Sequence, residues 1–216
     1  MWHVAIIGAG AIGSPLAFGL SQRPESGEVT IIDGDQVQLS NLARQPWYEA
    51  QDVGQGKAAL LARRLQPDVA PVRLQAVPHM LTEDNVDGLL SSADLVMDAT
   101  DNWETRLIIQ DWAARHHRPW IFNSAVRLEG MSTCLAPGGP CLKCWFGATT
   151  SEGPRCFEAG VLGSVTLAVA GQALRLFDQW LKVPGQPSAL WLVDGLAGKF
   201  RAINPGSLRC HHYGIG

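Results

Sequence analysis

Short apolar runs alternate with segments of helical periodicity along the first 125 residues of this 216-residue chain. Apolar residues that recur every three or four positions predict helices, and short apolar runs that end in Gly or Asp predict buried strands. The expected strands are residues 3–7, 29–32, 72–77, 95–97 and 120–122, and the helices between them are 11–20, 56–65, 82–90 and 103–117. This alternation predicts an α/β fold with a doubly wound, mostly parallel sheet.

The pattern changes after residue 125. A more exposed strand, a loop rich in Gly and Pro, one long helix and two final strands are expected at 127–135, 138–154, 160–181, 189–193 and 198–203. The long helix contains Arg175 and Asp178, which would be costly to bury in a membrane, so we interpret it as a core helix. We therefore predict a single domain over 1–216, with halves of about 1–125 and 126–216 and a mixed or antiparallel C-terminal extension of the sheet.

The composition limits the classes of partner. With 46% hydrophobic and 17% charged residues the chain can bury a substantial core, which excludes disorder as its main state. The formal charge of -3 offers no general basic field, so we expect no nucleic-acid partner. The start of the chain has no signal-peptide pattern, and we expect a cytoplasmic protein with no membrane partner. Five cysteines, an odd number, favour metal binding or thiol chemistry over a disulfide framework.

A glycine-rich turn is expected between the first strand and the first helix. The sequence G-A-G-A-I-G places Gly8, Gly10, Ala11 and Gly13 where a tight turn exposes helix N–H groups to a phosphate. Asp33 follows 20 residues after Gly13, at the end of the second strand, where a carboxylate can accept hydrogen bonds from a ribose. The context is Rossmann-like and predicts a nucleotide site. Alternatively, the glycines only allow close packing and Asp33 caps a turn.

Two cations and a carboxylate indicate which nucleotide would bind. Arg44 and Lys57 could both reach phosphates, which a triphosphate requires and a dinucleotide does not. The alternative is that both are solvated surface charges. Asp101 follows the fourth strand and could bind Mg²⁺, or it could cap the next helix, as could Asn102. We expect Arg106 to pair with a nearby carboxylate.

In combination, these segments resemble the ThiF/MoeB/HesA family, the bacterial relatives of ubiquitin-activating enzymes. The matching segments are 8–13, 32–45, 53–57, 98–102, 141–144 and 156–161, in the expected order. The resemblance implies an enzyme that uses ATP and Mg²⁺ to adenylate the C-terminal carboxylate of a small ubiquitin-like sulfur carrier protein ending in Gly-Gly, with release of pyrophosphate. It implies sulfur transfer in cofactor or metabolite biosynthesis, such as that of thiamine. A homodimer is also implied, and a sulfurtransferase is a further candidate partner.

The resemblance also assigns roles to residues. Asp101 would be the Mg²⁺ ligand and catalytic carboxylate, and Arg44 and Lys57 would neutralise the phosphates, because the reaction brings negative charges together. Relatives usually lend an arginine from N-terminal helices to the partner subunit, and we expect none from the N-terminus of this chain. The full set expected to bind the nucleotide is Gly8, Gly10, Ala11, Gly13, Asp33, Ser40, Asn41, Arg44, Lys57, Asp101 and Asn102.

A Cys-x-x-Cys pair, Cys141 and Cys144, has the spacing of half a tetrahedral zinc site. In the family a second such pair lies near the C-terminus. By that alignment one of its cysteines is replaced by serine and the other is Cys210. His211 or His212 could supply the fourth ligand, and we predict a structural Zn²⁺ on the three cysteines and His212. The alternative is a degenerate site with thiols packed as small hydrophobic groups.

The remaining cysteines carry separate predictions. Cys156 precedes the long helix, where the helix N-terminus and Arg155 could lower the pKa of its thiol. By resemblance, Cys156 is the thiol that in some relatives accepts sulfur or links covalently to the carrier; the alternative is an inert buried thiol. Cys134 falls inside an expected strand and is predicted to lie in the core.

Two other functions are also compatible with the sequence. An NAD(P)-dependent oxidoreductase accounts for the glycine turn and Asp33 but leaves Arg44, Lys57 and the Cys pair unexplained. A catalytically impaired carrier-binding module is consistent with the absent arginine and the incomplete zinc motif.

Overall fold

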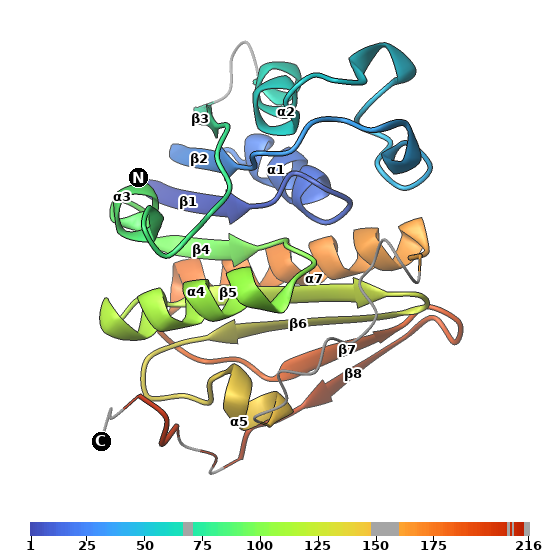
Figure 1. Cartoon of the computed structure of the whole chain (residues 1–216). Helices are drawn as coiled ribbons and strands as arrows, with labels where there is room; N and C mark the ends of the chain where they lie inside the picture. The colour runs from blue at the N-terminus through green and yellow to red at the C-terminus, as the bar shows by residue number, and fades with distance from the viewer. Residues whose placement is uncertain (67–70, 148–159, 207, 209, 214–216) are drawn as a thin grey trace.

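The computed structural model describes residues 1–66, 71–147, 160–206, 208 and 210–213 (Figure 1). The strands are β1 (Trp2–Ile7), β2 (Gly27–Ile32), β3 (Val72–Val77), β4 (Leu95–Asp98), β5 (Trp120–Val126), β6 (Glu129–Leu135), β7 (Leu190–Asp194) and β8 (Lys199–Ile203). The α-helices are α1 (Gly13–Ser21), α2 (Lys57–Leu65), α3 (Val86–Leu90), α4 (Trp103–Arg115), α5 (Leu142–Phe146) and α7 (Gly163–Lys182), and the 3₁₀ helices are η1 (Leu39–Asn41) and η2 (Ala50–Asp52).

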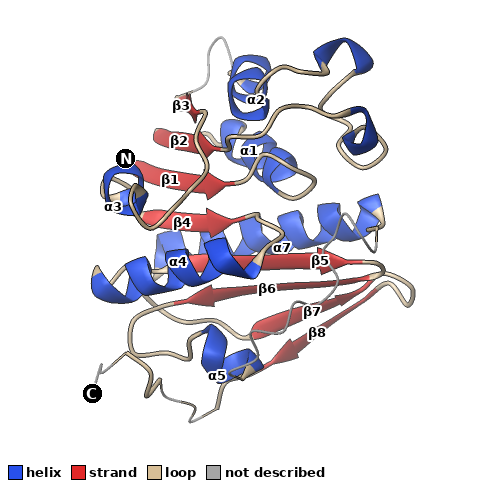
Figure 2. Ribbon diagram, in the orientation of Figure 1, coloured by secondary structure: helices blue, strands red, loops and turns tan. Residues whose placement is uncertain are grey.

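All these strands belong to one sheet with the order β3-β2-β1-β4-β5-β6-β7-β8. The first five strands in this order pair in parallel, whereas β5 to β8 pair antiparallel. Figure 2 shows this change of direction along the sheet, with helices on both of its faces. The predicted fold class is therefore confirmed, including the antiparallel C-terminal extension. In the sheet, Ile7 is in register with both Ile32 and Asp98, so β1, β2 and β4 end at the same edge.

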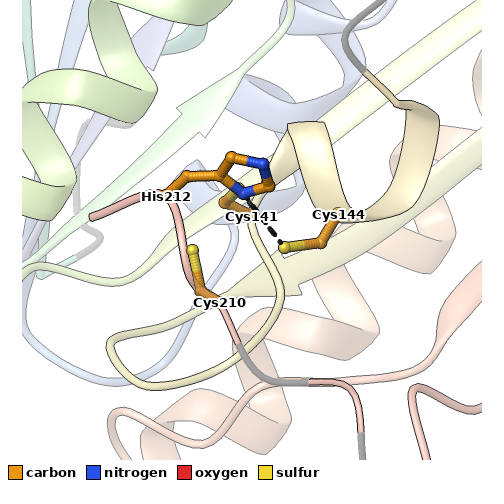
Figure 3. Close-up of side chains that lie close together, drawn as sticks. All are labelled: Cys141, Cys144, Cys210 and His212. Atoms are coloured by element: carbon orange, nitrogen blue, oxygen red, sulfur yellow. Dashed lines mark hydrogen bonds between the residues drawn. The ribbon is translucent and has the colours of Figure 1, made fainter. Parts of the chain in front are cut away.

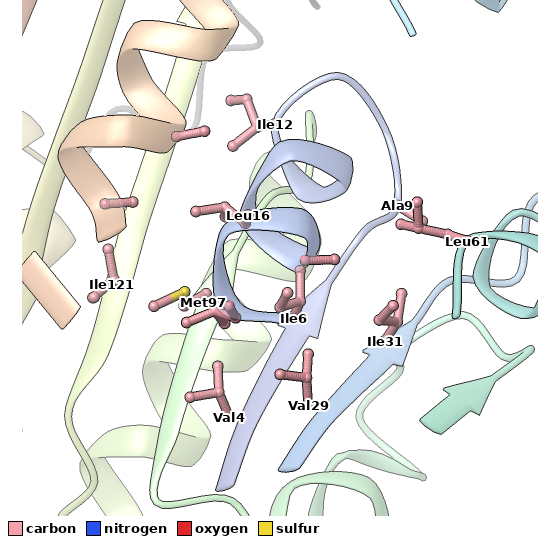
Figure 4. Close-up of a cluster of buried hydrophobic side chains, with 14 of the residues drawn as sticks. Val4, Ile6, Ala9, Ile12, Leu16, Val29, Ile31, Leu61, Met97 and Ile121 are labelled. Carbon is pink, nitrogen blue, oxygen red and sulfur yellow. The ribbon is translucent and has the colours of Figure 1, made fainter. Parts of the chain in front are cut away.

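The sheet separates two hydrophobic cores. In β1, Val4 and Ile6 point into the core beneath α1, α2 and α7, and Ala5 and Ile7 point into the core beneath α3, α4 and α5. Figure 4 shows the first of these cores, where side chains of the strands meet those of α1. Because both faces are covered, the central strands are apolar at consecutive positions, as is typical of buried parallel strands.

Helix α7 packs on the sheet, as expected for a core helix. Its buried residues include Val165, Val169 and Phe177, which join the first core. Within the described part of the chain, no helix is both long and apolar enough to cross a membrane.

Several predicted boundaries differ from the structure. The helix expected over 82–90 begins at Val86, because Asn85 accepts a hydrogen bond from the Thr82 N–H in a preceding turn. The strand expected over 127–135 begins at Glu129, because Arg127 takes a left-handed backbone conformation (φ 54°) between β5 and β6. Helix α4 ends before His117, which is also left-handed (φ 51°). The 3₁₀ helices η1 and η2 were not predicted.

Candidate functional site

A cleft of about 1150 Å³ lies where β1, β2 and β4 end. Most of the residues expected to bind a nucleotide line it, namely Gly8, Gly10, Ala11, Asp33, Asn41, Arg44, Lys57, Asp101 and Asn102. Of the expected set, Gly13 and Ser40 are not among the described residues that line the cleft. The structure thus brings together side chains from four loops that lie far apart in the sequence.

The glycine-rich turn is shaped by close contacts. A Cβ atom at Gly8, whose φ is 99°, would lie 2.8 Å from the Ala99 carbonyl oxygen. A Cβ atom at Gly13 would lie 1.8 Å from the Gly8 oxygen. Gly13 therefore serves the packing of α1 against the end of β1, which was the alternative interpretation of this glycine.

Hydrogen bonds on both sides of Ala9 hold the same turn. The Ala9 N–H donates to Asp33 Oδ2 at 2.6 Å, and the Ala9 oxygen accepts from Tyr48 Oη at 2.7 Å and from Ser14 Oγ at 2.9 Å. Asp33 Oδ1 also accepts from the Asp35 N–H, at 2.7 Å. Burial raises the pKa of Asp33 above its ordinary value. A carboxylate has about four acceptor positions, so Asp33 can hold the turn and still accept from a ribose hydroxyl.

The two candidate phosphate-binding cations occupy different environments. Lys57 is only 7% exposed, and its Nζ lies 3.0 Å from Asp35 Oδ2. Arg44 is half-buried and donates from Nη1 to the Ser40 oxygen at 3.0 Å. Lys57 is therefore not a solvated surface charge, and a bound polyphosphate would compete with Asp35 for its ammonium group. Ser40 contributes its backbone to the position of Arg44.

A buried ion pair lies beneath the cleft. Asp98, at the end of β4, is fully buried, and its Oδ2 accepts from Arg106 Nε at 3.2 Å. Its Oδ1 accepts from the Thr100 N–H at 2.9 Å and from Thr100 Oγ1 at 2.6 Å. Arg106 Nη2 donates to the Thr100 oxygen at 2.7 Å and to the Asn123 oxygen at 3.2 Å. The expected pairing of Arg106 with a carboxylate is confirmed.

This network fixes the turn that carries Asp101. Thr100 is held on both sides by Asp98 and Arg106, and the next residue, Asp101, is exposed in the cleft. Asn102 is the N-cap of α4, since its side chain accepts from the Thr105 N–H at 2.8 Å. The capping role considered for these two residues therefore belongs to Asn102, which leaves the Asp101 carboxylate available to the cleft.

Three cysteines and one histidine come together from α5, its N-cap and the C-terminal segment (Figure 3). The Sγ atoms of Cys141 and Cys144 are 3.6 Å apart, and they lie 3.4 Å and 3.5 Å from His212 Nδ1. With Cys210, the four ligand atoms lie within 4.8 Å of one another. Tetrahedral bonds to zinc would give separations of about 3.8 Å between sulfurs and about 3.6 Å between sulfur and nitrogen. The four residues therefore fit a zinc ion.

Two thiols of this cluster have pKa values that differ from the ordinary one. Burial raises the pKa of the Cys141 thiol to about 12, whereas a hydrogen bond from the His212 backbone lowers the pKa of the Cys210 thiol. Of the two neighbouring histidines, His212 belongs to the group that could hold a metal ion. We refer to Cys141, Cys144, Cys210 and His212 as the Cys₃His cluster.

Of the other two cysteines, Cys134 and Cys156, the structure describes only Cys134. Cys134 is buried in the first core, and burial raises the pKa of its thiol to about 12, which confirms the prediction of a core residue. Cys156 lies outside the described residues.

Sequence reasoning missed several residues that shape the cleft. Gln45 is buried beside the glycine-rich turn, and its Oε1 has no hydrogen-bond partner among the described residues. It stands next to Arg44 and could have been assigned to the site with it. Tyr48 and Asn123 belong to no motif, because their roles depend on contacts with distant backbone. Further lining residues are Gln38, His79, Met80, Trp103, Phe122, Ser124, Met131, Phe146 and Thr166.

Comparison with known sequences matches the chain to one protein family and to several of its members. The model of the ThiF family matches residues 1–212. A sulfur carrier protein adenylyltransferase of Thermus thermophilus is 35% identical and covers 93% of this chain and 77% of its own length. The sulfur carrier protein ThiS adenylyltransferase of Bacillus subtilis is 38% identical over 78% of this chain and 51% of its own length. The SAMP-activating enzyme E1 of Haloferax volcanii is 35% identical over 74% of this chain and 60% of its own length. The chain thus spans from about half to about three quarters of these relatives.

Solved structures share the fold at low sequence identity. Crystal structures of E. coli MccB, alone and with ATP, have TM-scores of 0.82 and 0.81 and are each 18% identical. Each covers 99% of this chain, and the chain covers 64% and 66% of them.

Proposed function

The chain belongs to the ThiF family, and we propose that it is an ATP-dependent adenylyltransferase that activates the C-terminal glycine carboxylate of a small ubiquitin-like sulfur carrier protein. The names of its relatives support this reaction. The observation that carries the proposal is the cleft itself. It joins the glycine-rich turn, Asp33, two cations and the exposed Asp101 in one cavity large enough for a nucleotide and the end of a polypeptide.

In the proposed reaction, a carboxylate oxygen of the carrier attacks the α-phosphorus of ATP. The bond from that phosphorus to the oxygen bridging to the β-phosphate breaks, and pyrophosphate leaves with the electron pair. The acceptor needs no general base, because a C-terminal carboxylate is already ionised at neutral pH. Catalysis is then positioning and charge neutralisation, which the backbone of the turn, Arg44 and Lys57 can supply.

Metal ions have two proposed roles. Asp101 would hold Mg²⁺, which neutralises charge on the phosphates when it is bound. The Cys₃His cluster would hold a structural Zn²⁺, and the separations among the donor atoms of Cys141, Cys144 and His212, which are close to those of tetrahedral zinc ligands, support this. The homodimer, the sulfurtransferase partner, the link to thiamine biosynthesis and the sulfur-transfer role of Cys156 remain predictions from the family resemblance.

The competing oxidoreductase hypothesis is tested by ligand binding. Calorimetric titration with Mg·ATP, NAD and NADP should show binding of Mg·ATP alone among the three. Binding of a dinucleotide in preference to ATP would contradict the proposal.

Turnover is tested by exchange of pyrophosphate into ATP in the presence of a carrier protein that ends in Gly-Gly. Asp101→Asn should reduce the exchange rate by about 10²-fold or more. Asp84→Asn, at an exposed carboxylate away from the cleft lining, is the matched control and should leave the rate unchanged. Nucleotide binding without exchange would instead favour the impaired carrier-binding module.

A further inference from the structure

Helix α5 contributes to two sites at once. Cys141, at its N-cap, and Cys144 point into the Cys₃His cluster, whereas Leu142, Lys143 and Phe146 line the nucleotide cleft. His212, which reaches the cluster from the C-terminal segment, also lines the cleft. The cluster therefore adjoins the wall of the cleft, to which it contributes His212.

By itself, α5 is too short to be stable. It has five residues and no side-chain cap, and isolated helices shorter than about 12 residues are marginal in water. Apart from its own turns, α5 is attached to α4 by a hydrogen bond from the Leu142 N–H to Gln110 Oε1, at 3.1 Å. The C-terminal segment is attached to α4 by a hydrogen bond from Tyr213 Oη to Asp111. An ion bound by the cluster would join these two attachments into one cross-linked unit.

The C-terminal end of α5 contacts the floor of the cleft. The Phe146 ring packs against the rings of Trp103 and Phe122, with centroids 5.7 Å and 5.5 Å apart. These two rings cover the guanidinium group of Arg106, at 5.4 Å and 5.1 Å. Trp103 follows the turn that carries Asp101 by two residues. A displacement of α5 would therefore change the surface beside the proposed reaction centre.

We propose that occupation of the Cys₃His cluster by a divalent metal ion builds the acceptor end of the cleft, so that metal loading controls binding of the polypeptide substrate and not of ATP. This inference rests on the proposed function. Of the proposed nucleotide contacts, Gly8 and Asp33 directly follow parallel strands and Lys57 is paired with Asp35, whereas the wall at Lys143 and Phe146 depends on α5. The occupant at that wall is the C-terminal tail of the carrier. The ammonium group of Lys143, an exposed residue, would attract the terminal carboxylate and the carbonyl oxygens of that tail.

The test compares metal-free and zinc-loaded protein, prepared with a chelator and a thiol reductant and reloaded with one equivalent of Zn²⁺. Three quantities are measured: amide hydrogen exchange of residues 141–147, affinity for Mg·ATP, and affinity for a synthetic ten-residue peptide that ends in Gly-Gly. Metal removal should speed hydrogen exchange at residues 141–147 and weaken peptide binding about tenfold. The expected loss of affinity corresponds to the free-energy cost of ordering one or two side chains of the wall when the peptide binds. The affinity for Mg·ATP should change by less than about twofold.

The outcomes separate the proposed effect of the metal on peptide binding, here called the coupling, from the proposed function. Unchanged hydrogen exchange and unchanged peptide affinity in the metal-free protein would overturn the coupling. An equal loss of ATP and peptide affinity would also overturn it, because the metal would then support the whole cleft. A zinc-loaded protein that binds Mg·ATP but not the peptide would refute the carrier tail as the occupant, while exchange at 141–147 would still report the effect of the metal on α5.

Two pairs of variants localise the effect. His212→Ala should lower zinc affinity by more than the about 10–100-fold that follows loss of a residue that only supports a ligand, and it should reproduce the metal-free exchange pattern. His211→Ala, at an exposed neighbour outside the cluster, should do neither. Lys143→Ala should retain zinc and Mg·ATP but weaken peptide binding about two- to fivefold, as for a surface charge. Lys199→Ala, at an exposed lysine on β8, is its control. Equal effects of the two lysine variants would exclude a specific role of Lys143.

Discussion

The parallel and antiparallel parts of the sheet hold their sites in different ways. On the parallel side, the candidate nucleotide residues follow strands whose residues are almost all buried, and hydrogen bonds fix each turn before any ligand binds. On the antiparallel side, every residue of β8 is exposed, and the Cys₃His cluster joins residues 71 positions apart in the sequence. The difference indicates that burial of the preceding strands organises the first site, and we propose that a metal cross-link completes the second.

The largest expected effect tests the burial argument. Asp98→Ala should destabilise the fold by about 3–5 kcal/mol, because it leaves the buried Arg106 guanidinium without its carboxylate. Asp101→Ala, three residues away at an exposed position, should change stability by less than about 0.5 kcal/mol while impairing catalysis. Urea unfolding followed by circular dichroism measures both. Similar losses for the two variants would contradict the distinction between a buried support and an exposed functional group.

A second prediction compares the effect on Mg·ATP affinity of removing one lysine from each side of the sheet. Lys57→Met should weaken Mg·ATP binding by about 10–100-fold, since it removes a charged hydrogen bond to the phosphates. Lys199→Met, on exposed β8, should leave that affinity unchanged. Calorimetry gives both dissociation constants. If Lys57→Met bound Mg·ATP with unchanged affinity, the ion pair with Asp35 would be its main role and the phosphate assignment would be wrong.

The sequence was most informative where structure follows from local pattern. The order of strands and helices on the parallel side was predicted because buried strands leave continuous apolar runs and turns require Gly or Asp. The positions of Gly8, Asp33 and Lys57 in the lining of the cleft were predicted for the same reason, since the first two directly follow strands and Lys57 begins a helix. The boundaries were less accurate where a single backbone conformation decided them, as with the left-handed Arg127.

Residues whose roles depend on distant contacts could not be predicted in this way. Tyr48 donates to Ala9, 39 positions away, and no local pattern marks it. Asn123 joins β5 to β4 and β6, accepting from Ser132 Oγ and donating to the Asp98 oxygen, which requires the pairing of these strands to be known. The sequence offered both His211 and His212 as candidate ligands, and the prediction of His212 had no local pattern behind it, because the choice depends on the path of the C-terminal segment.

A third, smaller effect tests how the antiparallel side is connected. Ser188 precedes β7, and its Oγ accepts from the Cys134 N–H at 2.8 Å and donates to the Ala189 oxygen at 2.9 Å. Ser188→Ala should cost about 1 kcal/mol of stability, measured by urea unfolding, because the Cys134 N–H loses its partner. Ser164→Ala, at an exposed position in α7, is the control and should have little effect. Equal losses of stability in the two variants would mean that the hydrogen bond from the Cys134 N–H to Ser188 does not contribute to the free energy of unfolding.

The smallest expected effect concerns the edge of the sheet. Phe200 on β8 is 52% exposed and pairs only with β7 among the described strands. Phe200→Thr keeps a residue suited to strands and removes little buried apolar area, so the free energy of unfolding should change by less than about 0.5 kcal/mol. Unfolding at several protein concentrations checks this value. A loss above about 1 kcal/mol that grows with protein concentration would show that a second copy of the chain covers β8, because a partner that binds only the folded state stabilises it by mass action. In that case β8 would be buried against a second copy of the chain. The antiparallel side would then also be organised by burial, and the contrast between the two sides of the sheet would apply only to the monomer.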